Sequence, residues 1–325
     1  MTGPINVAAV GGFHVGGRTV HVTGQPVREA RLAAAAGPAR PVDPNGTYRA
    51  EQMYVQYVRL VAPRAPHPLL LWHGGGMSGV TWEDTPDGRP GWQQRFLAAG
   101  HDVYVSDATE RGRASWFPYP GVMPGEPILR SMEEMWDLFR FGPPEGWSDD
   151  PARRRPFPGS AFPLDRIDRL ADQTVPRWAG NEPATIAAYE ALLDRLGPSV
   201  VIAHSQGCAF GLAAARGGHD RVRALVVIEP SGAVRPETVD LGRASGVPHL
   251  VVWGDFIDRS PTWTAYRASF DAYATALGSA GGWVDVLDLP ARGIRGNSHL
   301  PMMDSNGDQI ADLVQEWLVR QGLAG

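Results

Sequence analysis

The chain has 325 residues, of which 43% are hydrophobic, and a formal net charge of −5. This length allows one large α/β domain with an insertion, or two small domains, and the composition is that of an ordinary globular protein. The negative charge gives no reason to expect nucleic acid or an anionic membrane as a partner. The single cysteine, Cys208, excludes an internal disulfide and a cysteine-rich metal site.

The beginning of the chain, MTGPINVAAVGG, has no basic segment followed by a long apolar core. No later run approaches the roughly 18 apolar residues of a membrane span. We therefore expect a cytoplasmic protein, with export left open. Residues 13–22, FHVGGRTVHV, predict two short strands around Gly16 and Gly17, an N-terminal hairpin.

A buried strand over 69–72 leads directly into His73-Gly74-Gly75-Gly76. Successive glycines let the backbone approach a ligand closely and expose N–H groups. The motifs of a P-loop and of a dinucleotide site are absent, which leaves a flexible turn or an oxyanion hole. For an oxyanion hole we expect the N–H of Gly75 as one donor, with Gly76 as the fallback.

The stretch after the next strand, over 102–106, contains Arg111 and Arg113. These two could bind a phosphate or carboxylate, but pairing with Asp107 or Glu110 is the more ordinary role.

Residues 116–180 are rich in proline, aromatic residues and arginine and contain no strand-like run, while 128–141 has helical spacing. Because ligands bind at the carboxyl ends of parallel strands, we expect this insertion to be a cap over an apolar pocket there. A structural excursion or an oligomer contact is the alternative. The many tryptophans of the chain suggest an aromatic-lined site, although core packing is their commoner role; they include Trp82, Trp116, Trp136 and Trp147.

Residues 199–216 predict a buried strand, a sharp turn and a helix, with Ser205 at the corner. The sequence Ala203-His204-Ser205-Gln206-Gly207 is the pattern G-x-S-x-G with alanine in place of the first glycine. A serine that only caps the helix is the alternative. In the catalytic interpretation Ser205 is the nucleophile and the N–H of Gln206 is an oxyanion donor.

Two later strands end in carboxylates. Glu229 follows the strand over 224–228, whereas Asp255 and Asp258 follow the strand over 250–253 and compete with it as the acid. The loop over 293–300 brings His299 to the start of the last helix. Serine, acid and histidine at the ends of successive strands indicate a catalytic triad that needs no metal or organic cofactor.

Longer segments resemble the bacterial esterase 713-like group of α/β-hydrolases: WHG at 72–74, TWEDTPDGR at 81–89, RGR at 111–113, HSQG at 204–207, IEP at 228–230 and GNSH at 296–299. The resemblance spans most of the chain from Phe13 to the last helix. It implies a mostly parallel, doubly wound sheet with helices on both faces, carboxylic-ester hydrolysis, often a homodimer, and Glu229 as the acid. This chain departs from the group in having three glycines after His73, a place where the relatives vary.

We therefore expect a single α/β-hydrolase domain over 1–325, with a hairpin at about 13–22 and a cap insertion at about 116–180. The expected function is hydrolysis of a small-molecule carboxylic ester through an acyl-enzyme. A lactonase, a thioesterase or an acyltransferase would share every catalytic part. A dehalogenase or epoxide hydrolase would need aspartate in place of Ser205, and a non-catalytic binding protein would be expected to have lost part of the triad.

Overall fold

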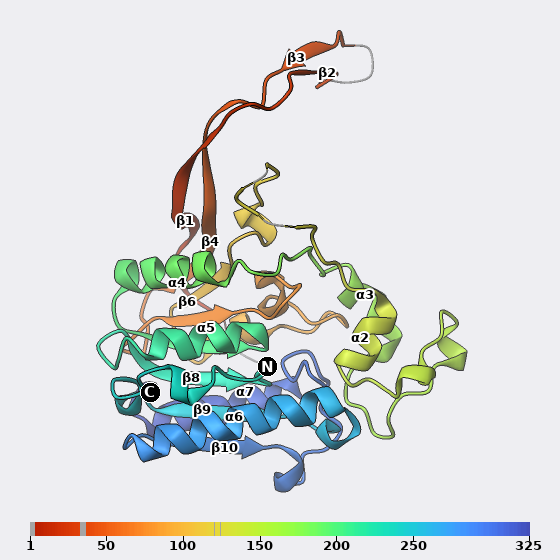
Figure 1. The fold of residues 1–325 in the computed structure, drawn as a ribbon. Helices are drawn as coiled ribbons and strands as arrows, with labels where there is room; N and C mark the ends of the chain where they lie inside the picture. The colour runs from red at the N-terminus through yellow and green to blue at the C-terminus, as the bar shows by residue number, and fades with distance from the viewer. Residues whose placement is uncertain (1–3, 33–36, 120, 124) are drawn as a thin grey trace.

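The fold is built on an eight-stranded sheet in the order β1-β4-β6-β5-β7-β8-β9-β10 (Figure 1). The computed structural model describes residues 4–32, 37–119, 121–123 and 125–325. The strands from β6 to β10 are parallel to one another, and β4 and β1 extend the sheet antiparallel. The strands of this sheet are β1 (Val7–Val22), β4 (Gly46–Leu60), β5 (Leu69–Trp72), β6 (Val103–Asp107), β7 (Ser199–His204), β8 (Val222–Ile228), β9 (His249–Trp253) and β10 (Val284–Asp288).

Helices cover both faces of the sheet, as the alternation of side chains in its central strands requires. Leu69 and Leu71 of β5 pack into the cluster that contains helices α1 (Trp92–Ala98) and α7 (Gly307–Arg320). The residues between and after them, Leu70 and Trp72, pack into a second cluster with helices α4 (Glu182–Leu196), α5 (Gln206–Ala215) and α6 (Pro261–Ser279). The predicted α/β-hydrolase fold is confirmed.

The residues predicted as a hairpin, 13–22, instead belong to one continuous strand, β1. Val15 pairs with Met53 and Arg18 with Ala50, so both halves of the segment use β4 as their partner rather than each other. The glycines serve a close approach: Gly16 has a φ of 67°, and a Cβ there would lie 2.9 Å from the Cα of Ala188 on α4.

Beyond the sheet, β1 and β4 continue as a two-stranded arm that projects from the body of the molecule (Figure 1). The short strands β2 (Arg28–Ala30) and β3 (Arg40–Val42) pair at its tip. At the base of the arm, Val22, Ala50 and Phe117 form a small separate apolar cluster.

The insertion over 116–180 carries two α-helices, α2 (Met132–Leu138) and α3 (Ile167–Ala171), and otherwise short 3-10 turns and loops. Helix α2 is shorter than the helical pattern over 128–141 indicated, and it begins with a Ser131 cap that accepts the N–H of Glu134. Trp136, Phe141 and Phe162 belong to the same hydrophobic cluster as the central strands. The insertion is therefore packed onto the main core.

Within the part of the chain that the structure describes, no helix has both the length and the apolar character needed to cross a bilayer.

Candidate active site

Ser205 lies at a sharp turn between β7 and α5, with φ 52° and ψ −118°. This left-handed conformation is strained for a residue with a side chain and is held by close packing on both sides. A Cβ at Gly207 would lie 2.6 Å from the carbonyl oxygen of His73, and a Cβ at Gly74 would lie 2.9 Å from the Cβ of Ser205. The Ser205 side chain makes no helix-capping hydrogen bond, so the capping alternative is wrong.

The glycine turn after β5 is held by the buried imidazole of His73. Its Nδ1 lies 2.9 Å from the carbonyl oxygen of Gly74, and its Nε2 lies 3.0 Å from the backbone nitrogen of Ala108, which donates to it. Burial lowers the pKa of His73 to about 4, so the ring is neutral and donates through Nδ1. Gly75 and Gln206 line the same pocket as Ser205, and among the described residues no turn or loop hydrogen bond uses either N–H.

His299 and Glu229 meet in the buried interior behind Ser205. The His299 Nδ1 atom lies 3.2 Å from Glu229 Oε2, and both side chains are fully buried. The other oxygen, Oε1, accepts hydrogen bonds from Arg140 Nη2 at 2.8 Å and from the backbone N–H of Gly254. Glu229 itself has a φ of 51°, a second strained conformation in this region.

The other two candidate acids do not contact His299. Asp255 accepts the backbone N–H of Phe256 on Oδ1 at 2.8 Å and that of Gly296 on Oδ2 at 2.9 Å. It therefore fixes the start of the histidine loop. Asp258 is exposed and lies 3.9 Å from Arg259.

Arg140 is the buried cation behind Glu229, and the sequence patterns did not single it out. Besides its bond to Glu229, its Nε donates to the Asp255 carbonyl oxygen at 2.8 Å, and its guanidinium lies 4.8 Å from the ring centre of Trp263. Its φ of 59° is also left-handed. The one available signal was an arginine between Phe139 and Phe141 just after α2, since a buried arginine needs a partner.

Asp304 is a second buried group that sequence reasoning missed. It accepts hydrogen bonds from Asn297 Nδ2 at 2.9 Å and from the N–H and Oγ of Ser298 at 2.8 Å each. These bonds fix the loop immediately before His299. Burial raises the pKa of Asp304 to about 7.

The imidazole of His299 is enclosed by other rings. Its centre lies 4.1 Å from that of Trp263, 4.6 Å from that of His204 and 5.5 Å from that of Phe139. Burial, together with the positive charges of Arg140 and Arg130, lowers the pKa of His299 well below its ordinary value. A neutral imidazole can accept a proton, as a general base must.

Ser205 and His299 open onto one pocket of about 270 Å³. Of the tryptophans expected there, none lines it, and the pocket tryptophan is Trp263 of α6. The full lining comprises Gly74, Gly75, Met77, Arg130, Leu138, Phe139, Arg177, Glu182, His204, Ser205, Gln206, Ala209, Phe210, Ser231, Trp263, Tyr266 and His299.

Arg111 and Arg113 do not line this pocket. They form ion pairs with Glu110 at 3.2 Å and with Asp107 at 2.7 Å, as the more ordinary interpretation expected.

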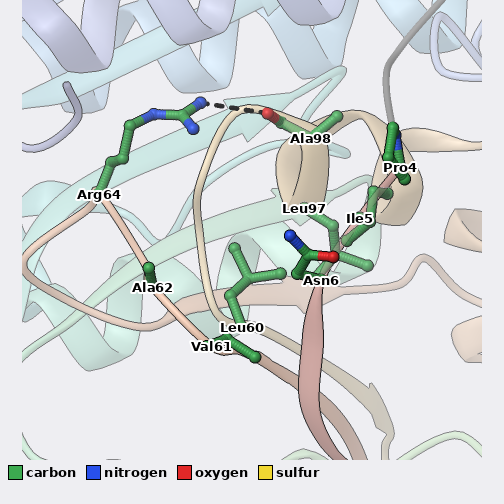
Figure 2. Close-up of a pocket in the computed structure, with 9 residues that line it drawn as sticks. All are labelled: Pro4, Ile5, Asn6, Leu60, Val61, Ala62, Arg64, Leu97 and Ala98. Carbon is green, nitrogen blue, oxygen red and sulfur yellow. Dashed lines mark hydrogen bonds between the residues drawn. The ribbon is translucent and has the colours of Figure 1, made fainter.

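A different cavity, of about 320 Å³, lies between Asn6, Leu60 and Leu97 at the opposite edge of the sheet (Figure 2). Among the described residues that line it, Arg64 is the charged one, and it donates to the carbonyl oxygens of Ala98 and Gly325. None of these described lining residues is a nucleophile or a base, so they do not form a candidate catalytic site.

The fold and the pocket define an α/β-hydrolase, and comparisons with known proteins agree. No family model matches the chain. A solved structure described as a novel bacterial esterase is 32% identical, covers 98% of both chains and superimposes with a TM-score of 0.81. A probable secreted lipase from a fungal species, strain ATCC 74256, is 29% identical over 330 residues, which is 85% of this chain and 88% of the relative.

The chain therefore belongs to the α/β-hydrolase superfamily and, within it, to the bacterial esterase group that its motifs resemble. It is an enzyme of the esterase and lipase type.

Proposed function

We propose that this chain hydrolyses carboxylic esters through an acyl-enzyme, with Ser205 as nucleophile, His299 as general base and Glu229 as the acid of the triad. The observation that carries the proposal is the shared pocket of Ser205 and His299, with His299 Nδ1 held 3.2 Å from the buried Glu229 carboxylate. This is the arrangement of a triad in which the base is oriented from behind by an acid.

In the first step Ser205 Oγ attacks the ester carbonyl carbon while His299 Nε2 takes the hydroxyl proton. The tetrahedral intermediate then expels the alcohol, which leaves with the proton returned by His299. In the second step water attacks the acyl-enzyme, gives its proton to His299, and Ser205 departs as the hydroxyl. The carboxylate of Glu229 stabilises the positive imidazolium of His299 in both steps and keeps its own charge.

The negative oxygen of both intermediates would be bound by the backbone N–H groups of Gly75 and Gln206. Gln206 is the first residue of α5, so its N–H belongs to the positive end of a helix. A Cβ at Gly75 would lie 2.9 Å from Gln206 Oε1 and 3.0 Å from Arg177 Nη1, so a larger residue there would displace both side chains. One such donor is typically worth about 3 kcal/mol of transition-state stabilisation.

Labelling with a fluorophosphonate tests the nucleophile directly. We expect the wild type to be labelled at Ser205 and to hydrolyse 4-nitrophenyl butyrate, and the Ser205→Ala variant to lose both properties. Ser279→Ala, an exposed serine at the end of α6, is the control and retains both. A folded wild type that is neither labelled nor active on esters, lactones or thioesters would contradict the proposal.

Two further parts of the proposal concern the state of the enzyme in the cell. From the family resemblance we propose a homodimer, which light scattering of the purified protein tests. For the location we propose the cytoplasm, while the fungal relative carries the name of a secreted lipase. Fractionation of the source cells, with activity assayed in the cytosol and the medium, distinguishes the two locations.

A further inference from the structure

Two arginines of the insertion, Arg130 and Arg177, reach the glycine turn beside Ser205. Both line the catalytic pocket, and the backbones of Arg177 and Ile128 pair, with Arg177 N donating to Ile128 O at 3.0 Å and Ile128 N to Arg177 O at 2.7 Å. A Cβ at Gly75 would lie 3.0 Å from Arg177 Nη1, and a Cβ at Gly76 would lie 3.4 Å from Arg130 Nε. Both guanidinium groups are thus held against the turn that would supply an oxyanion donor.

The charges of these two arginines are only partly neutralised by the protein. Arg130 pairs through Nη1 with Glu134, while its side chain is 12% exposed and its Nε is buried without a hydrogen-bond partner. Arg177 has no ion pair among the residues that the structure describes, and its Nε is likewise buried and unpartnered. Burial and the nearby charge of Arg177 lower the pKa of Arg130.

The acidic groups around the pocket do not cancel this charge. Glu110 is engaged by the neighbouring Arg111 at 3.2 Å and by the backbone N–H of Trp178 at 2.9 Å. Glu182 lines the pocket but is exposed to solvent, where a charge is screened. The positive charges of Arg130 and Arg177 are close enough to repel each other, and an anion bound at both guanidinium groups would offset that repulsion.

Apolar side chains also line the pocket, namely Leu138 of the insertion and the aromatic rings of Phe210, Trp263 and Tyr266. Ser205 therefore shares a pocket of about 270 Å³, a volume suited to a small substrate, with two cations and with apolar side chains.

We propose that the substrate is a short ester that also carries a carboxylate, which Arg130 and Arg177 bind while the uncharged part lies against Leu138 and the aromatic side chains. This inference rests on the proposed ester hydrolysis at Ser205. A guanidinium donates two parallel hydrogen bonds to a carboxylate, and such charge-assisted bonds are the strongest that a protein side chain makes to this group. Arg130 and Arg177 then determine the specificity for esters that carry a carboxylate, and Ser205 and His299 perform the chemistry on charged and uncharged esters alike.

Matched pairs of esters separate this role from general catalysis. The first pair places the charge on the acyl side: the mono-4-nitrophenyl ester of glutaric acid against 4-nitrophenyl valerate, which has a methyl group in place of the carboxylate. The second pair places it on the alcohol side: the butyrate ester of glycolic acid against ethyl butyrate, followed by titration of released acid. We expect kcat/KM of the wild type to be at least about tenfold higher for the charged member of one pair, with a preference that falls as salt is raised.

Removal of either guanidinium should abolish the preference. We expect Arg177→Met and Arg130→Met each to lower kcat/KM for the preferred charged ester by about 10- to 100-fold more than for its neutral partner. Arg166→Met, which removes an exposed arginine of the same insertion, is the control and changes neither rate.

The possible failures are distinguishable. If the wild type hydrolyses the neutral esters well and prefers neither charged ester, the carboxylate proposal is wrong and the esterase proposal stands. If the arginine variants lose activity equally on charged and neutral esters, the two arginines act on the transition state or on the fold, and the specificity role is again wrong. If the wild type hydrolyses no ester and is not labelled at Ser205, the proposed function itself fails.

Discussion

The hydrogen bonds of Glu229 determine what its amide variant should do. Oε1 accepts from Arg140 Nη2 and from the N–H of Gly254, so this position must keep an acceptor. In Glu229→Gln the amide oxygen therefore remains at Oε1, and the amide NH₂ group takes the place of Oε2, 3.2 Å from His299 Nδ1.

That orientation forces His299 into the wrong tautomer. Because the amide NH₂ group of the variant is a hydrogen-bond donor, His299 Nδ1 must accept from it, and the ring proton moves to Nε2. A protonated Nε2 can no longer take the proton of Ser205. When a triad carboxylate is changed to an amide and the histidine takes the wrong tautomer, kcat falls by about 10⁴-fold, which corresponds to about 5.5 kcal/mol in the activation barrier. We expect a loss of that order in kcat for 4-nitrophenyl butyrate, with little change in KM.

Asp255→Asn is the matched comparison, because Asp255 was the competing acid. Its oxygens accept only backbone N–H groups, from Phe256 and Gly296, and the amide can keep one of these bonds. We expect a loss of about 1–3 kcal/mol in the free energy of unfolding and a change in kcat of less than about tenfold.

Stopped-flow or steady-state release of 4-nitrophenol, with urea unfolding of each variant, makes the comparison. The reasoning is refuted if folded Glu229→Gln keeps more than about a tenth of the wild-type kcat. It is refuted equally if Asp255→Asn loses about 10³-fold or more, since Asp255 would then be the acid.

Three other changes have defined outcomes. Gly207→Ala brings a Cβ within 2.6 Å of the carbonyl oxygen of His73 and should lower the free energy of unfolding by about 1–3 kcal/mol. Gly246→Ala, whose Cβ would have nothing within 4 Å, should leave the free energy of unfolding unchanged. Arg130→Met removes a charge that lowers the pKa of His299, so the acid limb of kcat/KM should move to higher pH; an unmoved limb contradicts this. The pKa of Asp304, about 7, lies above that of an unfolded aspartate, so the free energy of unfolding should fall by about 4 kcal/mol as pH rises from about 4 to 7. Asp304→Asn, measured by urea unfolding at several pH values, should lack that slope, and a parallel slope contradicts the assignment.

The parts of the site that the sequence could predict are those defined by local backbone geometry. The turn at Ser205 needs a small residue two positions away on each side, and the oxyanion turn needs glycine, so both produce short recognisable patterns. Glu229 follows β8 directly and His299 lies in the loop between β10 and α7, so their place at the carboxyl ends of the strands was predictable from the order of elements. Their mutual contact was not, because three carboxylates had equivalent positions in the pattern.

The groups that the sequence could not predict act across long separations in the chain. Arg140 and Glu229 are far apart in sequence, and neither has a neighbouring residue that indicates the other. Arg130 and Arg177 belong to a segment whose proline and aromatic content indicated an apolar cap, and the pattern gave no information on where their side chains point.

The prediction of a hairpin over 13–22 was wrong for the same reason, because the deciding contacts are distant in the chain. A glycine pair with positive φ is typical of a tight turn, and it is equally suited to a strand that passes close to a helix. The choice between them depends on the partners of β1, which are β4 and α4, and these lie dozens of residues later in the chain.

The contacts of the insertion show that it is a fixed part of the site. The backbone N–H of His299 donates to the carbonyl oxygen of Phe139 at 3.0 Å, Arg140 bonds to Glu229, and Trp263 Nε1 donates to the carbonyl oxygen of Leu138 at 2.7 Å. Lifting the insertion away would break all three contacts and leave the buried carboxylate of Glu229 without its cation, which costs several kcal/mol. We therefore predict that a substrate enters the pocket while this end of α2 stays in place, and that the same segment both shapes the pocket and orients His299, the proposed base.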